Sequence, residues 1–555
     1  MQALKSRTMF QDVATSNIAC KQAPTFRSWL AFALAIGALR VSAAPSDVPV
    51  VFNPYVVTLA SPAGPGSMEP SLTTGPDRTV YLCWTEAVPA GGRVLKYSVL
   101  DLEGRRWSPA RVIVQGADLE KSSANFPSLV VQPGGRLTAV WSVNNPAPAS
   151  PAPGAAMAGH EHAEGHMHND DARHAMYRQS SDNGLTWGEP RPLSRESEST
   201  AFPSLRALPD GTILAAWLDG RGKKAMGDPE KLYARVLGSA GPDVLLDPKV
   251  CECCQTTITG FPDGSALVAY RGRTDEEIRD IMAVRYIDGQ WEAPARLSRD
   301  RWKIAACPIN GPHVDSEGPR VSAAWFTAAD NEPRVLVASS PDAGGLYTMP
   351  SRVDLGHPTG HVDTLILHGG AQLVSWLEGP GDDASQPAGL YLRRYASFGA
   401  TLAPARLADA PAKSAISGVP HVVLAKDFDD TPAQVVAAFT RDGENTQVQT
   451  LLVTLPDAAT LAAADSTCGC SPSGDELIGY PIRGRITAVM TERNSIKLQH
   501  VALPGVLRGG EREFKAAPNV IAALQAGREV LGRVEQRSGE WWIFDVRLLQ
   551  ATPQP

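Results

Sequence analysis

Histidine and methionine side chains are concentrated in one short stretch of this 555-residue chain, GHEHAEGHMHNDDARHAM at residues 159–176. Five of its eleven histidines lie there: His160, His162, His166, His168 and His174. Imidazole suits copper and zinc, and thioether sulfur suits copper(I), so the composition indicates transition-metal binding. The Pro- and Ala-rich run at 144–154 predicts a flexible or extended spacer, so these histidines are expected to collect ions without a rigid site. A loop that only aids solubility is the alternative.

Cysteines form a second group with metal-ligating chemistry. Cys251, Cys253 and Cys254 lie in VCECCQ at 250–255, and Cys307 begins CPINGP at 307–312. Thiolates ligate copper and zinc, whereas an oxidising compartment favours disulfides. One interpretation is a disulfide between Cys307 and either Cys253 or Cys254. The other is a thiolate and imidazole site for copper or zinc, and the residues alone leave both open.

A charged segment, YRGRTDEEIRD at 270–280, offers a different chemistry. Arg271 and Arg273 are candidates for binding an anionic ligand, because guanidinium groups bind carboxylates with two parallel hydrogen bonds. An ion-paired loop between two strands is the alternative. No catalytic residue and no organic cofactor are assigned.

A repeated pattern predicts the elements that position these residues. A short strand, often beginning Pro-Ser-Leu, leads through a glycine-containing turn to a strand with an aromatic end. These aromatic residues are Trp84, Trp141, Trp217, Tyr270, Trp325, Trp376 and Phe439. Seven such units without helical segments between them predict an all-β chain folded as a β-propeller. Residues 50–59 are expected to supply the strand that closes the ring, and the histidine-rich insertion at 145–176 falls in the second unit.

Alignment of the units predicts which residues meet at the mouth of the ring. The corresponding starts of the inner strands are Glu69, Asn125, Cys254, Cys307, Asp363 and His421. Inner strands of a propeller run beside its axis, so their starts converge. The four cysteines are therefore expected to be neighbours, with His361 and His421 not far away.

The turn sequences carry a family resemblance. SSDNGLTW at 180–187 fits Ser-x-Asp-x-Gly-x-Thr-Trp, and SPDAGGLY at 340–347 is a weaker copy. In such a hairpin turn Asp and Ser are expected to bond to local backbone amides, glycine to take a positive φ, and the aromatic ring to pack between blades. The two turn sequences resemble the Asp-box of the sialidase, or BNR-repeat, superfamily, and the likeness extends over about residues 50–455. It implies a propeller, with six blades in the enzymes of that family against seven units counted here. It also implies, as one reading, an exo-sialidase-type glycoside hydrolase or a glycan-binding propeller. No Arg-Ile-Pro-like strand, which carries the first of the family's three arginines, occurs near the start.

The C-terminal part reads as a separate small domain. The propeller is expected over 44–465 and a linker over 466–478, and residues 479–550 then predict five strands and a short helix, an OB-like β-barrel. Stretches such as GYPIRG at 479–484 and WWIFDV at 541–546 are similar to the copper-chaperone (CusF-like) domain of periplasmic efflux systems. That resemblance implies a Cu(I) site of one histidine and two methionines. Only His500 stands at a matching position, because the methionine positions fall on or near Gly510 and Arg512. The alternative for His500 is a surface residue of a strand.

The amino terminus and the overall charge restrict location and partners. Lys21 and Arg27 precede an apolar run at 29–39 and small residues at 41–43, which predicts a signal peptide over 1–43 and a periplasmic or secreted protein. The run is too short to span a bilayer, so no membrane span is expected after its removal. A net charge of −7 gives no reason to expect nucleic acid as a partner.

Two hypotheses of function follow. The first is a non-enzymatic exported propeller that binds or handles a transition metal, copper before zinc, with metal ions or periplasmic proteins as partners. Three features favour it: the histidine-rich loop, the cysteine group and the chaperone-like tail. The second is the sialidase-type hydrolase or glycan-binding propeller, which the family resemblance alone implies.

Overall fold

The computed structural model describes residues 52–144, 173–456 and 480–548, apart from short gaps. The gaps are residues 90, 198, 225–227, 369, 382–386, 396–401, 412–414, 429–430, 504–505 and 538. The expected signal peptide and linker lie outside the described residues, as do His160, His162, His166 and His168. None of the described helices is long and apolar enough to cross a membrane.

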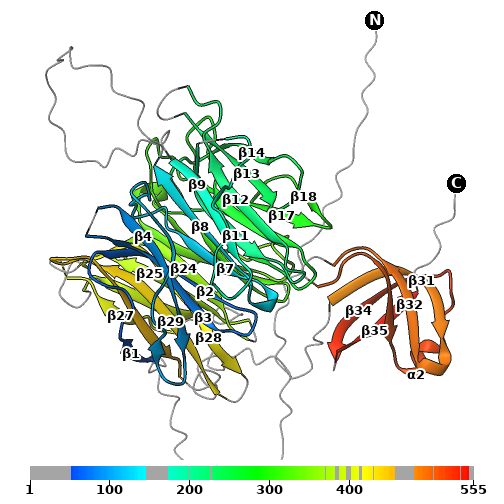
Figure 1. Ribbon diagram of the computed structural model, residues 1–555. Helices are drawn as coiled ribbons and strands as arrows, with labels where there is room; N and C mark the ends of the chain where they lie inside the picture. Colours follow the sequence, from blue (N-terminus) through cyan, green and yellow to red (C-terminus); the bar gives the residue numbers. More distant parts are fainter. Residues whose placement is uncertain are drawn as a thin grey trace, which may run out of the picture. The chain divides into compact units, whose positions relative to one another are not determined.

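Seven antiparallel sheets form the blades of a propeller (Figure 1). The first blade contains β2 (Ser67–Thr74), β3 (Val80–Ala87), β4 (Arg93–Asp101), β5 (Arg106–Trp107) and β6 (Arg111–Gly116). The second contains β7 (Ser128–Val131), β8 (Leu137–Asn144), β9 (Arg173–Ser180) and β10 (Arg191–Pro192). The third contains β11 (Thr200–Ala207), β12 (Ile213–Asp219), β13 (Glu230–Val236) and β14 (Val244–Val250). The fourth and fifth are β15 (Thr257–Gly260), β16 (Ala266–Arg271), β17 (Ile281–Ile287), β18 (Gln290–Trp291) and β19 (Ala295–Arg296); and β20 (His313–Glu317), β21 (Arg320–Thr327), β22 (Arg334–Ser340) and β23 (Ser351–Arg352).

The sixth blade is β24 (Pro358–Ile366), β25 (Gln372–Glu378), β26 (Gly389–Tyr395) and β27 (Ala405–Asp409). The seventh joins β28 (Ile416–Phe428), β29 (Thr431–Arg441) and β30 (Gln447–Thr454) to β1 (Tyr55–Leu59) from the other end of the propeller. The predicted all-β propeller and its seven units are confirmed. The predicted closing strand is confirmed as well, because β1 pairs with β30 in antiparallel register.

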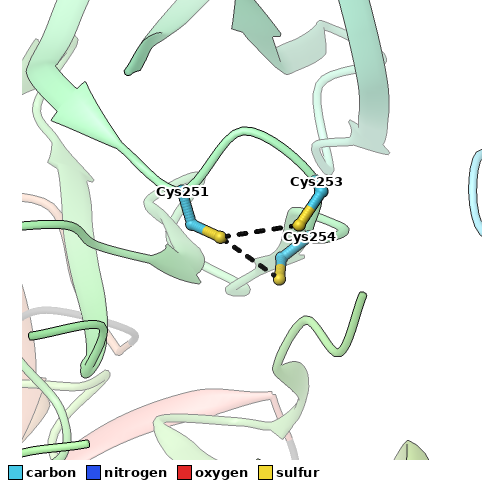
Figure 2. A group of neighbouring side chains, drawn as sticks. All are labelled: Cys251, Cys253 and Cys254. Atoms are coloured by element: carbon cyan, nitrogen blue, oxygen red, sulfur yellow. Dashed lines mark hydrogen bonds between the residues drawn. The ribbon is translucent and has the colours of Figure 1, made fainter. Parts of the chain in front are cut away.

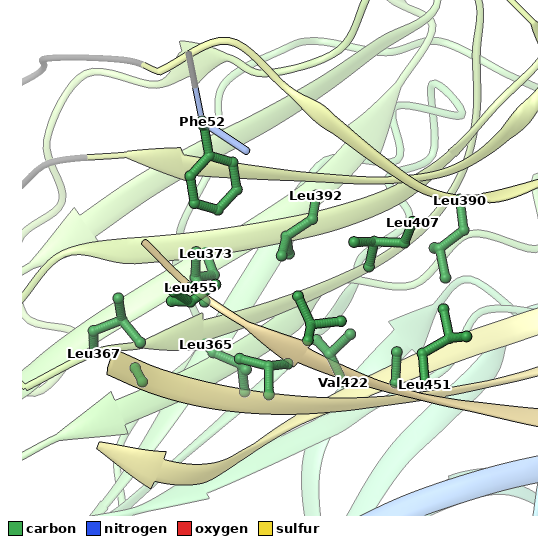
Figure 3. Packing of buried hydrophobic residues seen from close by; sticks show 14 of the residues in the cluster. Phe52, Leu365, Leu367, Leu373, Leu390, Leu392, Leu407, Val422, Leu451 and Leu455 are labelled. Carbon is green, nitrogen blue, oxygen red and sulfur yellow. The ribbon is translucent and has the colours of Figure 1, made fainter. Parts of the chain in front are cut away.

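The cores lie between neighbouring blades. Every residue of β12 and β25 is buried, because a central strand is covered on both faces by adjacent sheets. Five of the aromatic residues singled out by the repeat, Trp84, Trp217, Tyr270, Trp325 and Trp376, have no exposed surface. Figure 3 shows one such core, in which Leu373 and Leu392 of the sixth blade pack with Val422 and Leu451 of the seventh.

The Asp-box turns stabilise hairpins and help to join blades. Asp182 Oδ1 accepts the backbone N–H of Thr186 at 2.9 Å, and Oδ2 accepts its hydroxyl at 2.6 Å. Gly184 has a φ of 75° and donates its N–H to Ser180 Oγ at 2.8 Å. The ring of Trp187 meets Tyr97 of the first blade edge-on, with centroids 6.2 Å apart. The interblade packing predicted for this aromatic residue is therefore confirmed.

Bulges at the starts of the inner strands redirect side chains at the mouth. The register of β2, β11, β24 and β28 shifts near each start. Residues with positive φ stand beside these shifts: Glu69, Phe202, His361 and Gly418. An extra residue on one strand bends it and re-aims its side chains. Ile309, just before β20, has the same backbone conformation with a φ of 50°.

The C-terminal residues form the predicted closed five-stranded barrel. Its strands are β31 (Tyr480–Met490), β32 (Ser495–His500), β33 (Gly510–Lys515), β34 (Glu529–Arg537) and β35 (Glu540–Leu548), and α2 (Pro518–Ile521) follows β33. Ile486, Ile496, Leu498 and Phe514 are fully buried in its core. The barrel is the fold expected here, whereas the likeness to copper chaperones stays a prediction.

Closure of the ring generates a stability prediction. Leu59 is 3% exposed and packs with residues of the first and seventh blades, among them Val80 and Leu452. Leu59→Ala is expected to lower the free energy of unfolding by about 2–5 kcal/mol, measured by urea denaturation. Tyr55→Ala is the matched control on the same strand, because Tyr55 is 66% exposed, and should change it by less than about 0.5 kcal/mol. Equal effects would contradict the role of β1 in closing the core.

Candidate thiol site at the mouth of the propeller

The connection between the third and fourth blades carries three cysteines. β14 ends at Val250, and the chain then crosses to β15 with the Cys251 N–H donating to Arg271 O at 3.0 Å. Cys307 comes from the next connection, between β19 and β20. Cys253 and Cys307 form a disulfide, which resolves the two pairings left open by the sequence. The predicted proximity of these cysteines is confirmed.

Two free thiols lie beside this disulfide. Cys251 Sγ is 3.5 Å from Cys254 Sγ and 3.8 Å from Cys253 Sγ (Figure 2). All three cysteines are buried, and their sulfurs lie within 4.8 Å of one another. They are thus close enough for a dithiol, for exchange with the disulfide, or for a shared soft metal ion.

Arg279 and Glu252 border the thiols. Arg279 is 1% exposed, and its Nη1 donates to Cys251 Sγ at 3.2 Å and to Glu252 Oε2 at 3.1 Å. The guanidinium of Arg279 also pairs with Glu277, whose carboxylate accepts from Arg273. A buried guanidinium beside sulfur lowers the cost of the thiolate form, which is the nucleophile and the metal ligand, but at Cys251 burial and the neighbouring thiol outweigh this effect.

Arg271 is also buried, and its donors go to the backbone. Its Nε and Nη2 donate to Asn310 O at 3.0 and 2.8 Å, and its Nη1 donates to Arg279 O at 2.7 Å. Nη2 also donates to Phe326 O, and the guanidinium lies 5.0 Å from the centre of the Trp302 ring. Arg271 therefore holds together the connection that follows Cys307, the end of β21 and the thiol site.

The two thiols differ in acidity. Burial and the hydrogen bond with Cys254 raise the pKa of Cys251 well above its usual value. Burial also opposes ionisation of Cys254, but the hydrogen bond from Cys251 and the charge of Arg271 lower the pKa of Cys254 to about 7. Cys254 can therefore ionise near neutral pH, and its thiolate accepts a hydrogen bond from the thiol of Cys251.

The structure brings the four predicted cysteines together with Arg271 and Arg273. Arg273 donates to Glu252 and Glu277, so the ion-paired loop envisaged for the charged segment is present. An anionic ligand on Arg271 and Arg273 stays a prediction, in competition with these protein partners. Sequence reasoning missed Arg279 and Glu252 as neighbours of sulfur, although both stand in the segments that it singled out.

The two described histidines of the predicted metal set lie elsewhere. His174 is in β9 opposite Val143, so the strand starts at Arg173 and the last residues of the expected insertion pair with β8. His500 ends β32 and is 4% exposed, which corrects the alternative expectation of a surface residue. Its Nδ1 lies 2.8 Å from Val501 O, and its ring meets Phe514 edge-on. Neither histidine belongs to the cysteine group.

Comparisons with known proteins add likenesses of fold. No protein-family model matches the chain, and no curated protein matches it. Among solved structures, a Hadza microbial sialidase is 14% identical with a TM-score of 0.36, over 56% of this chain and 63% of that one, so less than two thirds of its length is covered. An alpha-L-arabinanase from Penicillium chrysogenum is 13% identical with a TM-score of 0.37, over 72% and 99% of the two chains. The BP39L lectin from Burkholderia pseudomallei is 12% identical with a TM-score of 0.44, over 69% and 98%.

The burial of Arg271 generates a prediction. Arg271→Met keeps the length of the side chain but removes the donors to three backbone carbonyl groups, so the free energy of unfolding should fall by at least about 3 kcal/mol in urea denaturation. Arg296→Met on the exposed β19 is the matched control and should cost less than about 0.5 kcal/mol. A loss below about 1 kcal/mol in the Arg271 variant would show that these hydrogen bonds are not structural.

Proposed function

We propose that this protein is an exported, non-enzymatic propeller that captures a soft transition ion, copper(I) before zinc, at Cys251, Cys253, Cys254 and Cys307. The observation that carries the proposal is the convergence of three buried sulfurs within 4.8 Å, with the fourth bonded to one of them. Four thiolates form the soft ligand set that both ions accept.

Charge balance supports the proposal. Several thiolates around one ion carry a net negative charge, which is costly to bury without compensation. Arg279 lies within hydrogen-bonding distance of Cys251, and the charge of Arg271 acts on Cys254. Glu252 and Glu277 partly neutralise the positive charge of Arg279 in the metal-free state. When an ion is bound, the thiolates supply further negative charge beside Arg279.

The oxidation state of the site controls how many ligands are available. While Cys253 and Cys307 are bonded, Cys251 and Cys254 are the free sulfurs of the group. A dithiol reductant converts the disulfide to two thiols and is itself oxidised to a disulfide, which supplies the third and fourth ligands. Metal affinity should therefore be higher in the reduced protein.

Calorimetric titration with Zn(II) tests the thiol site. The protein carries His160→Asn, His162→Asn, His166→Asn, His168→Asn, His361→Asn and His421→Asn, so that neither the histidine-rich stretch nor the histidines near the mouth contribute. The reduced form should bind one equivalent more tightly than about 1 μM, and disulfide formation should weaken binding at least about 10-fold.

The double substitution Cys251→Ser, Cys254→Ser should weaken Zn(II) binding by more than about 100-fold, because it removes two ligands. Cys83→Ala is the matched control, since Cys83 is a free buried thiol on β3 of the first blade, and it should leave the affinity unchanged. Equal affinity with and without the double-serine substitution, in this histidine-substituted background, would contradict the proposal.

The alternative is a sialidase-type hydrolase or a glycan-binding propeller. The propeller fold and its Asp-box turns support it, and these turns are hairpin structures rather than catalytic groups. Arg271, the candidate for binding a carboxylate, donates to backbone oxygens from Nε and both terminal nitrogens. The geometry therefore favours the thiol proposal.

A fluorogenic sialoside assay separates the two functions. The protein should release no fluorophore above the rate of a heat-denatured sample, because the candidate arginines are already paired within the protein. Turnover that disappears in an Arg273→Ala variant would reverse the ranking of the two hypotheses.

A further inference from the structure

A second polar group lies at the starts of three consecutive inner strands. His313 begins β20, His361 and Asp363 stand near the start of β24, and His421 follows the bulge of β28. These three histidines line one small cavity, bordered further by Phe126, Gln255 and Val419. Three blades thus supply one histidine each to a shared space.

Asp363 orients two of these rings. It is 1% exposed, and its Oδ1 lies 2.7 Å from His313 Nδ1 while its Oδ2 lies 3.5 Å from His421 Nδ1. Asp363 also accepts the backbone N–H groups of Thr364 and Val422, which fixes the carboxylate itself. A carboxylate on Nδ1 leaves Nε2 of each ring for another ligand, as in many metal sites with histidine ligands.

Two buried imidazole nitrogens of this group have no hydrogen-bond partner in the described structure, as is also true of His174 Nδ1 and His500 Nε2 elsewhere. The two in this group are Nε2 of His421, a residue that is 7% exposed, and Nδ1 of His361. Buried polar atoms are normally satisfied, so such atoms on one cavity indicate a missing ligand. The bulge at His361, with a φ of 52°, re-aims the chain here, and Asn310 Oδ1 accepts the His361 backbone N–H at 2.7 Å.

We propose that His313, His361 and His421 bind a divalent ion of the zinc or copper(II) type, with a water molecule or an anionic oxygen at an open coordination position. Three imidazoles with an open position are a ligand set that Zn²⁺ accepts, and imidazole suits Cu²⁺. Among the described residues, the cysteines are the group whose ligand atoms already lie within 4.8 Å of one another. The ligand nitrogens of the three histidines are farther apart, so the imidazole rings must rotate inward as the ion binds. Asp363 is the positioning residue.

This site shares no ligand with the thiol site, and its binding does not depend on whether the cysteines are oxidised or reduced. It uses no sulfur, so it should bind in the oxidised protein and without Cys251 and Cys254. The test uses the full chain with His160→Asn, His162→Asn, His166→Asn, His168→Asn, Cys251→Ser and Cys254→Ser, kept oxidised and titrated calorimetrically with Zn²⁺. Failure of the thiol proposal leaves this measurement unaffected.

One equivalent of Zn²⁺ should bind, and His361→Asn or His421→Asn should each weaken binding at least about 100-fold. Asparagine suits position 361 because it tolerates a positive φ, and the His361 side chain has no hydrogen bond to lose at Nδ1. Asp363→Asn should weaken binding about 10–100-fold, the usual cost of losing an outer partner. His368→Asn, beyond the other end of β24 and 61% exposed at its side chain, is the matched control and should have no effect.

A spectroscopic measurement separates ligation from a structural role. The electron paramagnetic resonance spectrum of the Cu²⁺-loaded protein should show coupling to three imidazole nitrogens, and to two in the His361→Asn protein. Melting of the metal-free variants identifies any that do not fold, in which case His361→Asn decides. Absence of Zn²⁺ binding tighter than about 100 μM, or unchanged affinity in the His361→Asn protein, would overturn the proposal.

Discussion

A four-stranded blade has two apolar faces, and only its neighbours in a closed ring can bury both. In this chain the ring is closed by β1, which pairs with β30 and places Leu59 between the first and seventh blades. Closure also fixes the inner strands around one axis. The connections that carry Cys251–Cys254 and Cys307, and the strand starts that carry His313, His361 and His421, owe their proximity to this constraint.

The thiol site is a balance of buried charges. Arg271 and Arg279 are each 1% exposed, and a buried guanidinium is tolerable only when all its donors are used. Backbone oxygens satisfy Arg271, whereas Glu252, Glu277 and Cys251 satisfy Arg279. The charge of Arg271 also lowers the pKa of Cys254, so the side chain that stabilises the mouth favours a thiolate there. The proposed metal capture is an extension of this balance.

Much of the fold could be predicted from local patterns. Turn glycines, Asp-box residues and the aromatic ends of strands recur with the blade, and they predicted the seven units, the closing strand and the interblade position of Trp187. Alignment of strand starts also brought Cys307 to the other cysteines. These features are repeated in the sequence because each blade meets the same physical requirements.

The rest depends on three-dimensional contacts that no local pattern contains. Cys253 and Cys254 are adjacent in the chain, and only the path of the loop decides which of them meets Cys307. Arg271 was a candidate for an external anion, but it is enclosed by carbonyl groups from segments up to 55 residues away. The burial of His500 depends on its contact with Phe514 of the neighbouring strand.

The central claim is that sulfur from the cysteine group holds a soft ion in the working protein. X-ray absorption at the copper and zinc edges, on protein isolated under reducing conditions from its own source, examines the ligands directly. The account predicts a shell dominated by sulfur, at about 2.3 Å if the ion is zinc, which is lost when Cys251 and Cys254 are serine. A shell of nitrogen and oxygen alone, or protein free of both metals, would contradict it.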